Sequence, residues 1–306
     1  MAALALLVNA FVWGVAWWPF RHLQQHGLHP LWATAFIYIV AMVLLLAWRR
    51  DAWRAFTRYP RLWLLLAAAG FTNVGFNWGV TIGDVVRVVL LFYLMPAWTV
   101  VLAWPMLGER PSPMALVRLA IAMTGVFFVL KTPEAGWPIP QSIPDWLAIA
   151  GGFSFALTNI VLRQMREVPA APRILAMFGG GAFLGAAAGL IGLAAGLVTP
   201  LPAPRIEWLG VGLALSLGFL ASNMALQYGA SRLNAHASAL IMLSEIVFAS
   251  VSSVALGAAQ MMPRTWIGGG LILLAAAWSA WPVGERRIEA AGDADAQSPG
   301  TSKGTP

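Results

Sequence analysis

Ten apolar runs, each about as long as the hydrocarbon core of a bilayer is thick, follow one another along the chain. Each run is continuously apolar over roughly 20 residues, without the strict alternation that marks the strands of a membrane barrel. The sequence therefore predicts an all-α membrane protein with ten transmembrane helices. The runs lie near residues 2–20, 31–48, 62–82, 85–106, 113–131, 145–163, 174–198, 207–228, 235–256 and 263–282.

The composition agrees with a membrane protein and excludes several other classes. Of the 306 residues, 59% are hydrophobic and only 10% are charged, and the mean hydropathy is +0.74. The absence of cysteine excludes disulfides, thiolate metal sites and cysteine nucleophiles. The net charge of +7 comes mainly from arginines in short loops, not from an extended basic surface, so we expect no nucleic-acid partner. His22, His26 and His29 lie in a loop without a neighbouring carboxylate, so we expect no metal and no cofactor.

The basic residues predict the orientation in the membrane, because cytoplasmic loops carry an excess of lysine and arginine. An N-terminus inside the cell places fourteen of the nineteen basic residues at the cytoplasmic side. Five remain outside, namely Arg21, Arg87, Lys131, Arg205 and Arg264. We therefore expect a multi-pass protein with both termini in the cytoplasm.

Polar residues inside one apolar run return 150 positions later. The segment from Asn73 to Gly79 carries two amides, Trp78 and a final glycine, and the segment from Asn223 to Gly229 repeats this pattern with Tyr228 in place of the tryptophan. Other matches share nearly the same offset, which is 142 in the first run of each half and 149 at Leu107-Gly108 and Leu256-Gly257. Because five helices is an odd number, the second copy must enter the membrane from the opposite face, which gives an inverted repeat.

The repeat divides the chain into four parts. We expect a first five-helix repeat over residues 1–131, an outer linker over 132–144, a second repeat over 145–284 and a disordered cytoplasmic tail over 285–306.

Several short motifs resemble a known transporter family. The segments from Phe11 to Gly14 and from Leu107 to Arg110, together with Pro96 and the ten-helix layout, are similar to the EamA repeats of the drug/metabolite transporter superfamily. The aromatic content and the segment from Leu243 to Phe248 most resemble its YddG-type aromatic amino acid exporters. The resemblance implies a secondary transporter that exports aromatic and other neutral amino acids, or related small metabolites, across a bacterial inner membrane by alternating access. The second repeat departs from the pattern, because Glu245 stands where the first has Pro96.

Glu245 is the one carboxylate that lies deep within an apolar run. A charge at the centre of a bilayer costs at least about 2.5 kcal/mol even on insertion scales, so this side chain should face a cavity, find a partner or be protonated. It could serve as a proton or substrate-ammonium site, or it could be a structural carboxyl hydrogen-bonded to a neighbouring helix. The sequence leaves both readings open.

The repeated amides also allow two readings. Asn73 and Asn77 are four residues apart, as are Asn223 and Gln227, so each pair shares one helix face. These amides could bind the charged groups of an amino acid, or they could join helices to one another. With aromatic side chains that could line an apolar pocket, they give the candidate substrate-binding residues Trp13, Trp17, Asn73, Asn77, Trp78, Tyr93, Asn159, Asn223, Gln227, Tyr228, Ser244 and Glu245.

Arg87 and His236 match at offset 149, near opposite faces of the membrane. With Glu245, they are the candidates for coupling or gating, although Arg87 could instead pair with Asp84 three residues away. Asp84 and Asp145 stand where the N-caps of the fourth and sixth helices would lie.

We do not expect an enzyme, because the deep carboxylate has no nucleophile or base motif beside it. Efflux of drugs or cationic compounds is the alternative to amino acid export. The expected partners are a small-molecule substrate, such as an amino acid, and the lipid bilayer, and both a monomer and a homodimer remain open.

Overall fold

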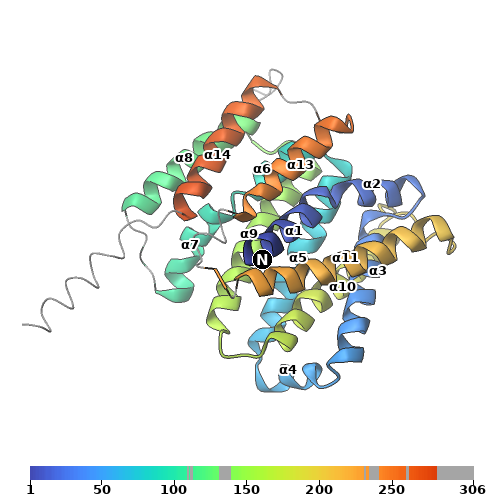
Figure 1. The fold of residues 1–306 in the computed structure, drawn as a ribbon. Helices are drawn as coiled ribbons and strands as arrows, with labels where there is room; N and C mark the ends of the chain where they lie inside the picture. The colour runs from blue at the N-terminus through green and yellow to red at the C-terminus, as the bar shows by residue number, and fades with distance from the viewer. Residues whose placement is uncertain are drawn as a thin grey trace, which may run out of the picture.

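The computed structural model describes residues 1–108, 110, 113–130, 139–230, 232–233, 241–259 and 262–280. Every regular element in these residues is a helix, which confirms the all-α fold class (Figure 1). The predicted tail at 285–306, most of the predicted linker and His236 lie outside the described residues.

The first half of the chain contains α1 (Ala2–Val15), α2 (Trp17–Gln25), α3 (Pro30–Trp48), η1 (Ala52–Arg54), α4 (Ala55–Arg58), α5 (Arg61–Ile82), α6 (Val85–Phe92), α7 (Met95–Leu107) and α8 (Pro113–Leu130). The second half contains α9 (Ile143–Gln164), α10 (Ala170–Ala194), α11 (Ile206–Ala230), α13 (Ser244–Ala255) and α14 (Pro263–Ala280).

Six helical segments among the described residues are long and apolar enough to cross a membrane. They are α1 with α2, then α3, α6 with α7, α9, α10 and α11. α8 and α13 are also apolar, but their apolar stretches, Pro113–Val129 and Ser244–Ala255, are shorter. The total of ten spans therefore stays a prediction.

Two of the predicted spanning runs are interrupted at matching positions. The first break separates α6 from α7, where Leu94 is the N-cap of α7, and the second precedes α13, where Leu243 is the N-cap. These two leucines are 149 residues apart. The helices also end alike, because Gly108 and Gly257 both adopt left-handed conformations, with φ of 72° and 68°. A left-handed residue after a helix favours glycine, so the repeated Leu-Gly pairs mark equivalent helix ends.

Contacts between the two halves obey the same offsets. α5 packs on α9 as α11 packs on α1. At these contacts a Cβ on Gly79 would meet Leu147 and Pro144, and a Cβ on Gly229 would meet Leu6 and Ala2. The first helix of each repeat therefore lies against the third helix of the other in nearly the same register.

Aromatic contacts show the same symmetry between the first helix of one repeat and the fourth helix of the other. Phe11 of α1 meets Phe248 of α13 edge-on, with ring centroids 5.4 Å apart. Phe153 of α9 meets Trp98 of α7 edge-on as well, at 5.5 Å. Phe11 and Phe153 are 142 residues apart, and Trp98 and Phe248 are 150 apart. The first helix of each repeat thus makes the same edge-on contact with the fourth helix of the other repeat.

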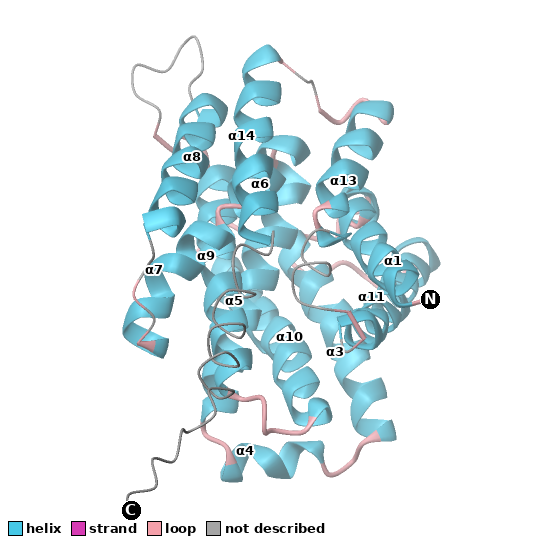
Figure 2. Ribbon diagram, turned by 60° about the vertical axis from the view of Figure 1, so that its left-hand side comes forward, coloured by secondary structure: helices cyan, strands magenta, loops and turns pink. Residues whose placement is uncertain are grey.

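Two further contacts join helices that occupy equivalent places in the repeats. α3 packs against α10, and α8 packs against α14, which lie side by side in both views (Figures 1 and 2). Gly125 and Gly268 make the second contact possible, because a Cβ on either residue would meet the other's carbonyl oxygen at 2.6–2.7 Å. Small residues that allow backbones to approach are typical of helix pairs in membranes.

Candidate functional site

The two helix breaks are joined by a hydrogen bond between Tyr93 and Glu245. Tyr93 lies between α6 and α7, and its hydroxyl donates to Oε2 of Glu245 at 3.2 Å. The same hydroxyl lies 3.3 Å from the carbonyl oxygen of Met242, just before α13. Both side chains are buried. The deep carboxylate therefore has a partner on the equivalent helix of the other repeat.

The position of Glu245 on its helix explains how the bundle tolerates a carboxyl group at this depth. It lies in the first turn of α13, where unpaired backbone N–H groups and the helix dipole favour negative charge. Gly14 of α1 packs directly on this turn, since a Cβ there would meet the Glu245 carbonyl oxygen at 2.8 Å. The helix end, the Tyr93 hydroxyl and the close approach of α1 together form the surroundings of the carboxylate.

A series of aromatic side chains leads from α1 to this hydrogen-bonded pair. Trp13 stacks on Phe219 with ring centroids 4.5 Å apart, and its other neighbour is Phe76 at 6.2 Å. Phe76 in turn meets Phe92 at 4.8 Å, and Phe92 lies 6.3 Å from Tyr93. The rings thus form a continuous path from α1 through α5 to the break after α6.

Trp17 and Ser244, two of the predicted site residues, also belong to this region. Trp17 is buried in the same apolar cluster as Tyr93, and its Nε1 donates to Ser252 of α13 at 3.0 Å. Ser244 precedes Glu245 and donates to the carbonyl oxygen of Ile241 at 2.6 Å. The structure therefore brings Trp13, Trp17, Tyr93, Ser244 and Glu245 to one part of the bundle.

The amides Asn73 and Asn77 bind α3. The Tyr38 hydroxyl donates to Oδ1 of Asn73 at 2.8 Å, and Nδ2 of Asn77 donates to Thr34 Oγ1 at 3.3 Å. Both amides are buried, so these bonds join α5 to α3 as interhelical amides commonly do in membranes. Oδ1 of Asn77 is buried without a hydrogen-bond partner among the described residues. Both amides thus make contacts that join two helices. Oδ1 of Asn77 is the acceptor without a described partner.

The other predicted site residues have different surroundings. Trp78 is half-buried and packs edge-on against His29 at 5.6 Å, where burial lowers the pKa of the imidazole. Asn159 is exposed, and its amide donates to the Phe155 carbonyl oxygen on its own helix at 3.0 Å. Tyr228 is exposed with the Arg232 guanidinium 3.8 Å from its ring centroid. None of these three contacts involves the Tyr93–Glu245 pair.

The two remaining candidate amides, Asn223 and Gln227, lie on α11. Asn223 is half-buried on α11, in the part of the chain that corresponds to Asn73. Gln227 lies on the same helix, but its side chain is outside the described residues.

Arg87 forms a bidentate ion pair with Asp145. Its Nε and Nη2 donate to the two carboxylate oxygens at 2.7 and 2.9 Å, and its Nη1 donates to the Val129 carbonyl oxygen at 2.6 Å. Asp84 instead caps α6 by accepting from the Arg87 backbone N–H at 2.8 Å, as the sequence predicts for an N-cap. The guanidinium does not make the alternative pairing with the Asp84 carboxylate, because Asp145 on another helix offers both oxygens.

The prediction that Asp145 caps α9 is also wrong. Ser142 is the N-cap, and it accepts a hydrogen bond from the Asp145 backbone N–H at 3.4 Å. Asp145 lies three residues later with only 1% of its side chain exposed, which frees its carboxylate for Arg87 and for the Gln141 N–H at 3.2 Å.

A polar cavity of about 540 Å³ opens beside this ion pair; we call it the end cavity. It lies where α6, α9 and α14 begin and where α8 and α13 end. Its lining includes Asp84, Arg87, Gln141, Ser142, Asp145, Arg264 and Thr265.

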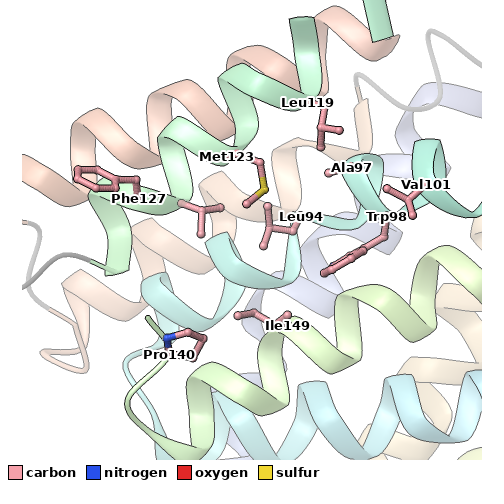
Figure 3. A pocket seen from close by; sticks show the side chains of 10 residues that line it. Leu94, Ala97, Trp98, Val101, Leu119, Met123, Phe127, Pro140 and Ile149 are labelled. Carbon is pink, nitrogen blue, oxygen red and sulfur yellow. The ribbon is translucent and has the colours of Figure 1, made fainter. Parts of the chain in front are cut away.

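A second cavity, of about 570 Å³, is apolar and lies between α7, α8 and α9 (Figure 3). Leu94 and Trp98 line it from α7, Met123 from α8 and Ile149 from α9. Nε1 of Trp98 is buried without a partner among the described residues. No sequence pattern predicts this cavity, because its lining residues are ordinary apolar side chains on three separate helices.

Comparison with known proteins identifies the class. The model of the EamA-like transporter family matches residues 1–131 and 142–281, so the chain belongs to this family. It is therefore a multi-pass membrane transporter, which confirms the expectation of a transporter.

Individual relatives are more distant. The chain is 27% identical over 150 residues to a Pseudomonas aeruginosa protein described as an uncharacterized transporter. That match covers 47% of this chain and 46% of the relative, so the chain spans less than half the length of the curated protein it matches. A solved crystal structure with 18% sequence identity superposes with a TM-score of 0.57, covering 94% of this chain and 98% of the other, and it shares the fold alone.

Proposed function

We propose that this protein is a secondary transporter that exports aromatic and other neutral amino acids across a bacterial inner membrane by alternating access. The observation that carries the proposal is the contact of Tyr93 with Glu245 at equivalent breaks in the two repeats. Broken helices at a repeat interface are the usual place of substrate sites in transporters built from inverted repeats. Both termini lie in the cytoplasm in this proposal.

The chemistry around Glu245 suits the two ends of an aromatic amino acid. The carboxylate accepts one hydrogen bond from Tyr93, and a carboxylate has room for several more. A substrate ammonium group would fill that capacity and neutralise the charge. Trp13 and Phe76 offer ring faces and edges for an apolar side chain.

The start of α7 supports binding of the substrate carboxylate. A helix that begins inside the bundle attracts an anion through the positive end of its dipole. The dipole is what α7 offers, because Pro96 has no N–H and the Ala97 N–H donates to the Leu94 carbonyl oxygen. Leu94 caps α7 without a side-chain hydrogen bond, and Tyr93 directly precedes it. In this proposal the zwitterion lies between the first turn of α7 and the Glu245 carboxylate, and Tyr93 holds that carboxylate in place.

Efflux of cationic compounds is the second candidate, because a deep carboxylate that accepts a hydrogen bond from a neutral hydroxyl would also attract a cationic drug. Purified protein in proteoliposomes separates the two functions. We expect counter-transport of labelled phenylalanine and, more weakly, threonine, whereas transport of a cationic dye alone would replace amino acid export with drug efflux.

Variants of Glu245 test its role. A hydrogen bond to a charged group contributes about 1.5–3 kcal/mol, so Glu245→Gln should lower phenylalanine exchange by roughly 10- to 100-fold. Glu207→Gln is the matched control, because Glu207 is an exposed carboxylate in the first turn of α11. Full exchange in Glu245→Gln would contradict the ammonium site. Loss of gradient-driven transport alone, with exchange intact, would make Glu245 a proton carrier instead.

A further inference from the structure

The Arg87–Asp145 ion pair fastens three helices at one end of the bundle. Arg87 projects from α6, contacts both Asp145 oxygens on α9 and donates to the Val129 carbonyl oxygen near the end of α8. Asp145 is 1% exposed and also accepts from the Gln141 N–H. Separation of α6 from α9 at this end would break all the bonds between the two charged groups at once.

The sequence does not repeat the two charged residues at the equivalent positions of the other end. The contacts of Gly79 with Pro144 and of Gly229 with Ala2 show that residues 142 apart occupy equivalent places in α1 and α9. The counterpart of Asp145 is therefore Ala3, and the counterpart of Arg87 at offset 149 is His236. Alanine has no group that could pair with an imidazole. The residue types that form the ion pair are thus present at one of the two equivalent places and absent from the other.

Such a difference has a direct consequence in a transporter made of inverted repeats. Inward-open and outward-open states exchange the roles of the two repeats, so two identical repeats would give two states of equal free energy. A contact between the repeats that is made at one end of the bundle alone stabilises only the state in which that end is closed.

We propose that the Arg87–Asp145 ion pair is a lock that keeps the end of the bundle next to the end cavity closed and thereby sets the resting state of the transporter. This inference rests on the alternating access of the proposed function, but not on the identity of the substrate. The lock must open in each cycle, and the end cavity provides polar surroundings in which the separating charges can be solvated. With both termini in the cytoplasm, the locked end is the outer one and the resting state faces inward.

The pair is suited to a lock more than to a permanent brace. Removal of one partner from a buried ion pair leaves an uncompensated charge, so a closed state that depends on the pair loses its advantage when either residue changes. The neighbouring carboxylate of Asp84 supplies the contrast, because it lines the same cavity but accepts its hydrogen bond from the Arg87 backbone N–H and not from the guanidinium.

Labelling of single cysteines in the cysteine-free chain tests the lock without any substrate. Ala148, fully buried on α9 one turn after Asp145, reports opening of the locked end. Its counterpart Leu6, fully buried on α1, reports opening of the opposite end. The measurement is the rate at which a membrane-impermeant maleimide modifies Ala148→Cys or Leu6→Cys in proteoliposomes and in detergent.

We expect Asp145→Asn to raise the labelling rate at position 148 by about tenfold or more and to lower it at position 6, because the two ends open alternately. Arg87→Lys, which keeps the charge but loses the bidentate geometry, should give an intermediate rate. Asp84→Asn should leave both rates unchanged, since asparagine also caps a helix.

Three results would overturn the lock. The first is equal labelling of Asp145→Asn and Asp84→Asn. The second is a rise at both reporter positions together, which would indicate general loosening and a purely structural pair. The third is failure of both Asp145→Asn and Arg87→Lys to fold, judged by size-exclusion chromatography. A shift in labelling without phenylalanine transport would leave the lock in place and refute only the amino acid substrate.

Discussion

The contact of α5 with α10 allows a sharp test, because two adjacent glycines of α10 face different surroundings. A Cβ on Gly180 would overlap the Leu66 carbonyl oxygen and lie 2.7 Å from the Gly70 nitrogen. The nearest neighbours of a Cβ on Gly179 would all be side-chain atoms, from Leu66 at 3.5 Å and from Met42 and Phe183 at 3.8 Å. We therefore expect Gly180→Ala to destabilise the protein and Gly179→Ala to leave it unchanged or slightly more stable.

The difference between the two variants isolates the steric cost. Both substitutions gain the same helix propensity, about 1 kcal/mol for alanine over glycine. In Gly180→Ala the obstructing atoms belong to the backbone, so no side-chain rotation can relieve the overlap and the helices must move apart. Forcing an extra methyl group into a packed contact costs typically about 1–3 kcal/mol, and we expect Gly180→Ala to be less stable than Gly179→Ala by that amount.

Thermal unfolding in detergent measures this difference, followed by fluorescence-detected size-exclusion chromatography after heating. The Gly180→Ala protein should lose its monodisperse peak several degrees below the Gly179→Ala protein. A midpoint for Gly180→Ala equal to or above that of Gly179→Ala would refute the close approach of the two backbones, and with it the packing of α5 on α10.

Two further predictions concern the polar contacts and the orientation. Tyr38→Phe removes the donor to Asn73 and leaves a buried acceptor unpaired, so it should lower the free energy of unfolding by about 1–3 kcal/mol. Asn73→Leu in the Tyr38→Phe background should recover part of that loss. No recovery would contradict the pairing of Tyr38 with Asn73. The orientation is tested in cells that produce the protein with a single cysteine at an exposed position. Thr57→Cys should react with an impermeant maleimide only after permeabilisation, and Gln24→Cys should react in intact cells. The reverse pattern would place the termini outside.

The fold could be predicted from the sequence because bilayer thickness and hydrophobicity act on each segment separately. The apolar runs correspond to the observed helices, and the Leu-Gly pairs at 107–108 and 256–257 end equivalent helices. The breaks at Tyr93–Leu94 and Leu243 were not predicted, although Pro96 follows the first and Ser244 and Glu245 follow the second. A break in a buried helix depends on what packs against it, which no local pattern records.

The candidate site could be predicted only in part, because spacing along one helix does not reveal which helix lies opposite. The depth of Glu245 in its apolar run identifies it as a candidate. Its partner Tyr93 is 152 residues away, and the sequence suggests a role only for the aromatic ring of Tyr93 and not for its hydroxyl. Arg87 likewise binds Asp145, 58 residues away, and not its near neighbour Asp84. Asn73 and Asn77 share a helix face as predicted, and the residues that bind them, Tyr38 and Thr34, carry no sequence signal of that role.

The packing of α3 on α10 and of α8 on α14 bears on how this chain originated. Each contact joins a helix to its own counterpart in the other repeat, as happens across the two-fold axis of a dimer of identical subunits. A five-helix chain inserted in both orientations would already bring these surfaces together. Duplication and fusion would then add a linker without requiring a new interface, and each copy would become free to acquire charges that the other lacks.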